Sequence, residues 1–167
     1  MELFDAIARR ASVRAFAPVN VPEADLLKIV DAARRAPSGG NRQPLNFIII
    51  QKEETLRALE KVQSCFATAS AAVAIVADPA ASRWWLEDAA AAAENMLLAI
   101  TALGYSSVWV EGTLLKEEEH AKKVLGVPAP KRLIIALPIG KAPQDTPQAD
   151  KKPLQDVLWR ERYGKKE

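Results

Sequence analysis

The stretch Ala36-Pro37-Ser38-Gly39-Gly40-Asn41-Arg42-Gln43-Pro44 forms a small, polar loop between a helical pattern and an apolar, β-branched run. Gly39 and Gly40 carry no side chain, so the backbone can approach a flat ligand closely there. Ser38, Asn41 and Gln43 supply hydrogen-bond donors and acceptors that can bind the edge of a heterocycle. The alternative is a connecting loop whose Asn and Ser side chains cap local backbone groups. Residues 36–44 are therefore a candidate binding loop directly before a strand.

A second candidate segment follows the first helical pattern of the chain. Arg10, Ser12 and Arg14 stand at alternate positions, and alternate side chains of an extended segment share one face. Two guanidinium groups and a hydroxyl on one face can bind the oxygens of a phosphomonoester. The alternative is a solvated helix end whose arginines complement the helix dipole.

Hydrophobic periodicity predicts helices and strands along the rest of the chain. The expected helices cover residues 2–10, 22–36, 53–62, 82–103 and 116–125, and the expected strands cover 47–50, 71–77, 106–110 and 132–137. A polar, Pro-rich tail over 140–153 precedes a final apolar segment over 154–162. Strict β-α-β alternation is absent, so the order predicts an α+β fold with a mixed sheet flanked by helices.

Composition excludes several classes of function. The 167 residues fit one domain with a substantial core. The net charge is only +2, and Lys and Arg alternate with acidic residues, which argues against nucleic acid as a partner. The sequence contains no run of about 18 apolar residues, so it predicts no membrane span. Cys65 is the only cysteine and His120 the only histidine, so we expect no disulfide, no metal site, a cytoplasmic location and a solvated His120.

Together, residues 10–16 and 36–44 closely resemble the paired signatures of the FMN-dependent nitroreductase family. Similar segments continue downstream in the family's order: 88–103 resembles its central dimer helix, 104–112 its next strand and flavin-contacting turn, 138–140 the end of its last core strand, and 151–154 its basic C-terminal element. The resemblance spans nearly the whole chain. It implies one flavin-binding domain over residues 1–167, a mixed, largely antiparallel sheet, and a homodimer exchanging a tail that begins at about residue 141.

The resemblance also implies which residues bind FMN. The implied set is Arg10, Ser12, Arg14, Pro37, Ser38, Asn41, Gln43, Gln63, Glu111, Gly112, Lys151 and Lys152. The N-terminal trio would hold the phosphate and ribityl chain with help from either lysine. Pro37 and Ser38 of the partner subunit would lie against the isoalloxazine ring. Asn41 and Gln43 would touch the flavin or shape the loop.

The resemblance implies that three further residues of this set contact the flavin ring. Gln63 would bind the pyrimidine edge, and the turn at Glu111 and Gly112 would face N5. Arg14 would place positive charge near the ring. Leu45 and residues 113–115 depart from the residues that the family often has there, so the substrate cavity is less well specified than the cofactor site.

The activity implied is electron transfer from NADH or NADPH through FMN to small nitroaromatic, quinone or related acceptors, in alternating half-reactions. No catalytic side chain is required, because the cofactor carries the chemistry. Other relatives remove halogen or fragment reduced flavin, and a flavin-binding or ligand-sensing dimer without useful turnover is a separate alternative. A purely structural domain built around the Ala-rich helix is a third. Trp84 and Trp85 would either cover the flavin or pack in an interface or core.

Overall fold

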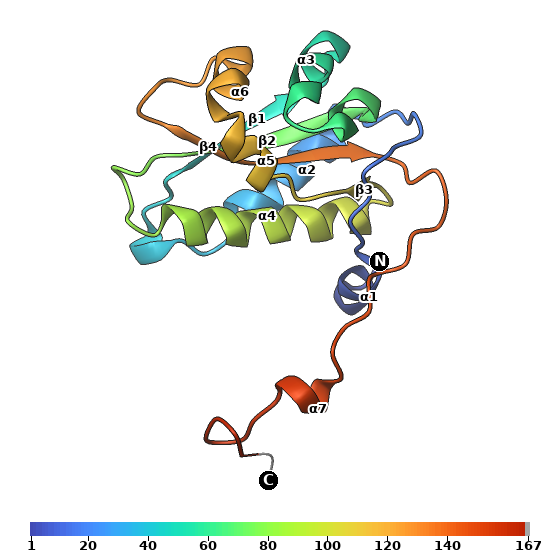
Figure 1. The fold of residues 1–167 in the computed structure, drawn as a ribbon, viewed down its shortest axis with the longest axis vertical. Coiled ribbons are helices and arrows are strands. Elements are labelled where there is room, and N and C mark those ends of the chain that lie inside the picture. The colour runs from blue at the N-terminus through green and yellow to red at the C-terminus, as the bar shows by residue number, and fades with distance from the viewer. Residues whose placement is uncertain (166–167) are drawn as a thin grey trace.

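The centre of the molecule is a four-stranded sheet in the order β1-β2-β4-β3, seen in a computed structural model that describes residues 1–165 (Figure 1). Its strands are β1 (Leu45–Ile50), β2 (Ala71–Ala77), β3 (Ser106–Ser107) and β4 (Arg132–Gly140). Neighbouring strands pair antiparallel, and an isolated parallel bridge joins Ser12 to Ser107. A largely antiparallel sheet flanked by helices confirms the predicted α+β fold.

The central strand β2 is buried on both faces because every one of its residues is small or apolar. Side chains alternate between the faces of a strand. Ala71, Val73, Ile75 and Ala77 accordingly pack into one core cluster, and Ala72, Ala74 and Val76 into the other. The sheet therefore separates two cores, each covered by its own helices.

The helices divide between these two faces (Figure 1). On one face lie α2 (Glu23–Arg34) and α4 (Trp85–Ala102), with α1 (Leu3–Arg9) beside α4; on the other lie α3 (Glu53–Ala58), α5 (Gly112–Lys116) and α6 (Glu118–Leu125). Ala89, Ala92 and Ala93 of α4 are buried in the first core. None of the described helices is long and apolar enough to cross a membrane.

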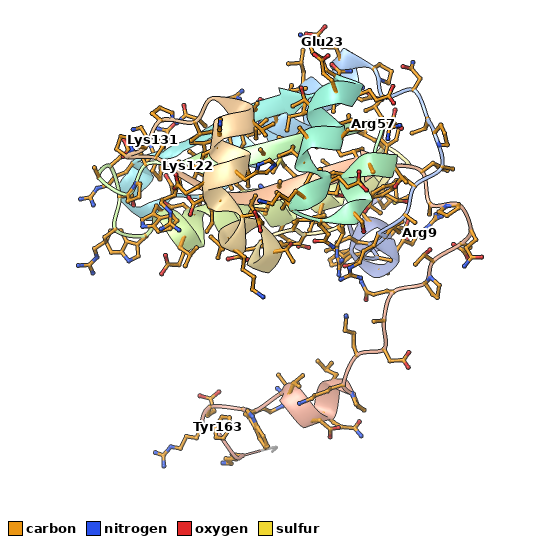
Figure 2. All side chains as sticks on the ribbon, turned by 45° about the horizontal axis from the view of Figure 1, so that its top comes forward. Arg9, Glu23, Arg57, Lys122, Lys131 and Tyr163 are labelled. Carbon is orange, nitrogen blue, oxygen red and sulfur yellow. The ribbon has the colours of Figure 1, made fainter. Side chains whose placement is uncertain are left out.

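The C-terminal tail leaves the body of the molecule after β4 and carries α7 (Leu154–Val157) away from it (Figure 1), and the side chains of α7 stand clear of the body (Figure 2). Leu154 is 72% exposed and Val157 55% exposed. Apolar surface of this kind marks a site of interaction. Residues 166 and 167, the last two of the expected tail, lie outside the described residues.

Several boundaries differ from the sequence-based expectations. Only Ser106 and Ser107 of the expected strand 106–110 pair as a strand, while Val110 forms an isolated bridge. Val108 and Val110 are buried in the second core, so packing accounts for the apolar pattern that predicted a longer strand. The last expected helical segment, 154–162, is helical only over α7.

The prediction for the region around His120 also needs correction. Helix α5 was not predicted, and Glu117, with φ −114° and ψ 23°, separates it from α6. His120 is half-buried rather than solvated, and its Nε2 lies 2.8 Å from the backbone oxygen of Ala58. The ring thus ties α6 to the end of α3. Helix α6 ends, as predicted, at Gly126, whose φ of +67° suits glycine.

Candidate functional site

The loop at residues 37–43 is held in a compact, strained form. It contains the short turn η1 (Gly39–Asn41), and Gly40, Asn41 and Gln43 all have positive φ angles of 60°, 54° and 49°. The backbone N–H of Gln43 donates to the side-chain Oγ of Ser38 at 3.1 Å, and the backbone N–H of Asn41 donates to the backbone oxygen of Ser38 at 2.8 Å. Positive φ at Asn and Gln is sparsely populated and needs support from its surroundings.

Asp88, in the first turn of α4, supplies that support. Its side chain is only 5% exposed, and Oδ1 accepts the Gly39 N–H at 2.9 Å. Its other oxygen accepts the hydroxyl of Ser82 at 3.3 Å. A buried carboxylate is stable only when it is hydrogen-bonded, so the loop and the start of α4 form one unit.

Trp84 closes the same loop from outside. A Cβ added at Gly39 would lie 2.5 Å from Cε3 of Trp84, so only glycine fits against this ring. The guanidinium carbon atoms of Arg42 and Arg83 lie 5.7 and 4.3 Å from the ring centroid. Trp84 therefore packs against the loop, whereas Trp85 packs against the first core.

The segment at residues 10–14 is extended and open. Val13 N–H donates to the Ser107 oxygen at 2.9 Å, and Ser12 bridges Ser107. Ser12 and Arg14 are exposed, as alternate positions on an extended segment predict, while Val13 points into the core. The segment is therefore fixed by its backbone and presents its polar side chains outward.

The two guanidinium groups of this segment are poorly neutralised. Arg10 lies 4.0 Å from Glu94 Oε1, the limit of an ion pair, and Arg14 has no ion pair among the described residues. Burial raises the pKa of the Cys65 thiol to about 11, and the positive charge of nearby Arg14 acts in the opposite direction. Ser107 Oγ is buried without a hydrogen-bond partner among the residues described. Unpaired cationic and hydroxyl groups of this kind suit an anion with several oxygens.

Gln63 and the start of α5 come together although they are far apart in sequence. Thr113 Oγ1 donates to Gln63 Oε1 at 3.1 Å. Glu111 Oε2 accepts the Trp109 Nε1–H at 2.8 Å, which orients the turn before exposed Gly112. Gln63 directly precedes η3 (Ser64–Thr68), and Thr68 Oγ1 accepts the Phe16 N–H at 3.2 Å. The turn containing Cys65 thus links Gln63 to the segment bearing Arg14.

Lys151 and Lys152 are exposed in the tail, just beyond Gln148. The Gln148 side chain donates to backbone oxygens at the end of α1, so the tail passes close to Arg10. No pattern in the sequence singles out Gln148, and the same holds for the buried anchor Asp88. Both were missed because the Gly39 N–H that Asp88 accepts and the carbonyl oxygens that Gln148 binds lie 49 or more residues away in the chain.

The structure does not bring the two main segments together within one chain. The loop is bonded to Asp88, near the start of α4. Ala11 and Val13 instead line a cavity of about 310 Å³ together with Thr101 and Gly104, which lie at the other end of α4. At 1.5 Å per residue, Asp88 and Thr101 are about 20 Å apart along the helix axis. The loop and the cavity lined by Ala11 and Val13 thus lie toward opposite ends of α4. No group of residues suited to a metal ion occurs in the described part of the chain.

Comparisons with known proteins agree with this architecture. The nitroreductase family model matches residues 7–75 and 61–141. An Archaeoglobus fulgidus protein named for NADH dehydrogenase/NAD(P)H nitroreductase activity is 33% identical and covers 97% of this chain and 99% of its own.

Two solved structures share the fold. A Parabacteroides distasonis protein with the same name has a TM-score of 0.87 at 25% identity, over 96% of this chain and 98% of its own. A Desulfovibrio desulfuricans protein named as a nitroreductase, in complex with FMN, has a TM-score of 0.83 at 26% identity, over 98% of each chain. The chain belongs to the nitroreductase family.

Proposed function

We propose that two copies of this chain bind FMN non-covalently and use NADH or NADPH to reduce small acceptors such as nitroaromatic compounds or quinones. Each copy acts as one flavin-binding domain of a cytoplasmic protein, with Cys65 kept as a buried, protonated thiol. When bound, FMN supplies the ring that accepts hydride and passes electrons on. The polypeptide binds and orients the reactants.

The observation that carries this proposal is the set of unpaired polar groups at residues 10–14. Arg14 has no described ion-pair partner, Arg10 has only a long one, and Ser12 is exposed beside them. The phosphate of FMN is an anion of matching chemistry, because guanidinium groups and hydroxyls donate to its oxygens. The family relative solved with FMN supports the same assignment.

The loop fits the other part of the ligand. Pro37 is exposed beside a small cavity of about 80 Å³ whose walls include Ser38, Gln43 and Phe47. A rigid loop in which Gly39 and Gly40 carry no side chain can lie against a flat ring. Asn41 is held with positive φ, so we assign Asn41 and Gln43 mainly to shaping the loop, and Pro37 and Ser38 to contacting the ring.

Gln63, Glu111 and Gly112 complete the ring end of the site. The bond from Thr113 orients the Gln63 amide, which can then bind a heterocycle edge through its free donor. Arg14 places fixed positive charge near this end, and such preorganised charge stabilises negative charge on a bound group. Gly112 leaves the approach clear, since a Cβ there would meet nothing within 4 Å.

The separation of the two segments along α4 supports a site shared between the two chains of a homodimer. Apolar surface is available for it: Phe4 of α1 is 81% exposed, and a groove of about 420 Å³ between α1, α2 and α4 is lined by Leu3, Leu98 and Ala99. The exposed apolar residues of α7 provide a matching surface on the partner's tail. Exchange of the tail would bury both surfaces.

The test is reconstitution of the purified chain with FMN, removal of free flavin, and addition of NADH or NADPH without oxygen. We expect a dimer that retains flavin absorption bands and loses them on reduction. Consumption of nitroaromatics, quinones, halogenated aromatics or excess reduced FMN then identifies the acceptor class. A colourless protein, or a monomer that retains FMN tightly, would contradict the proposal.

A further inference from the structure

Gln148 fastens the C-terminal tail to the end of α1. Its Nε2 donates to the backbone oxygens of Ile7 at 3.0 Å and Arg10 at 2.9 Å. Backbone carbonyls in the last turn of a helix have no partner within the helix. One side-chain amide carries two N–H donors, so Gln148 satisfies both carbonyls at once.

This attachment stands out within the tail. Among residues 143–158, Gln148 is the residue whose side chain makes hydrogen bonds to the body of the described structure; the bonds of Thr146 and Asp156 stay within the tail. Asp150, Lys151 and Lys152 are exposed beyond it. Gln148 therefore sets the point from which the rest of the tail departs.

That point limits where the two lysines can reach. An extended chain spans at most about 3.5 Å per residue, so the Cα of Lys151 stays within about 10 Å of that of Gln148. Gln148 is itself bonded to the backbone of Arg10. With the anchor in place, Lys151 remains at the end of the molecule that holds Arg10 and Ser12, and cannot stray toward the distant loop at residues 37–43.

We propose that Gln148 is a positioning residue for phosphate recognition: by pinning the tail to α1, it holds Lys151 and Lys152 beside Arg10 of the same chain, where their ammonium groups contact the FMN phosphate. The inference rests on the proposed function and adds the device that places the lysines. A flexible tail would instead lose conformational entropy each time the lysines closed on a ligand.

The ligand pair FMN and riboflavin separates this role from a general structural one. Riboflavin has the same ring and ribityl chain but no phosphate. In Gln148→Leu, two hydrogen bonds are lost, and we expect the Kd for FMN to rise about tenfold. The Kd for riboflavin should change by less than about twofold, because no contact with the ring depends on the anchor. Fluorescence quenching of the flavin measures both.

Further variants test that Gln148 acts through the lysines. Gln148→Glu keeps the length but cannot donate, and should weaken FMN binding at least as much as Gln148→Leu. In a Lys151→Gln/Lys152→Gln background, Gln148→Leu should add little, since coupled residues are not additive. Gln155→Leu, at an exposed position of α7 beyond the lysines, is the matched control and should bind both flavins normally.

Limited trypsin digestion without flavin gives an independent readout. Cleavage after Lys151 should be faster in Gln148→Leu than in Gln155→Leu at equal thermal stability; the bond after Lys152 precedes Pro153 and resists trypsin. An unchanged ratio of FMN to riboflavin affinity in both Gln148 variants would overturn the inference while leaving the proposed function intact. Failure of the unaltered chain to bind FMN would overturn both.

Discussion

The loop at residues 37–43 and the segment at residues 10–14 are held in opposite ways. The loop is locked by its own backbone bonds, by buried Asp88 and by Trp84 against Gly39. The segment at 10–14 is tied to Ser107 by its backbone, while its cationic side chains project with little neutralisation. The loop is thus fixed in conformation, whereas the segment at residues 10–14 presents positive charge that is little neutralised. Changes in the loop should affect stability most, and changes in the segment should affect ligand binding.

The largest expected effect is on the anchor of the loop. Asp88→Ala removes a buried carboxylate and leaves the Gly39 N–H and Ser82 hydroxyl without their acceptor. The free energy of unfolding should fall by about 3 kcal/mol, measured by urea denaturation. Exposed Glu87 is the matched control, and Glu87→Ala should cost less than about 0.5 kcal/mol. Equal losses for the two variants would show that the loop does not depend on Asp88.

Gly39→Ala tests the packing of the loop against Trp84. The added Cβ would lie 2.5 Å from Trp84 Cε3, and overpacking of this kind costs about 2 kcal/mol. A second substitution, Trp84→Leu, should restore part of the loss in a double-mutant cycle. Gly112→Ala is the control, because a Cβ there meets nothing within 4 Å. A loss that Trp84→Leu does not reduce would contradict the contact.

Arg14→Gln tests the segment at residues 10–14. The Kd for FMN should rise about tenfold, since a charge-assisted hydrogen bond is lost, or the reduction potential of the bound flavin should shift. Urea denaturation should be unchanged, in contrast to the loop variants. Arg57→Gln, at an exposed position paired with Glu53 in α3, is the control. Unchanged flavin affinity and potential would remove Arg14 from the site.

The smallest expected effect concerns Cys65, beside Arg14. Burial raises the pKa of this thiol to about 11, so the thiol stays protonated in the folded protein until the pH approaches that value. Iodoacetamide should therefore label the native protein far more slowly at pH 8 than the urea-unfolded chain, because only the thiolate reacts. Arg14→Gln should raise the pKa further by removing a favourable positive charge. Rapid native labelling at pH 8 would contradict the buried assignment.

The fold was predictable where local pattern and burial agree. Strand β2 has its predicted bounds because an unbroken apolar run fits a strand buried on both faces. The pattern was misleading at residues 106–110, where valines pack in the core without strand pairing. The pattern of Arg10, Ser12 and Arg14 predicted that the three side chains share one face; Ser12 and Arg14 are exposed, whereas Arg10 is half-buried. Asp88 and Gln148 could not be predicted, since each acts on a backbone group that only the folded chain brings near.

The central claim is that one flavin site takes residues 10–14 from one chain and residues 37–43 from the other. Mixed dimers of an Arg10→Gln/Arg14→Gln chain with a Pro37→Glu chain test it directly, with bound FMN counted by absorbance. Neither altered homodimer should retain FMN, whereas a mixed dimer should regain one of its two sites, because one site then combines unaltered segments from both chains. Mixed dimers that remain colourless would contradict the claim and place both segments of each site within a single chain.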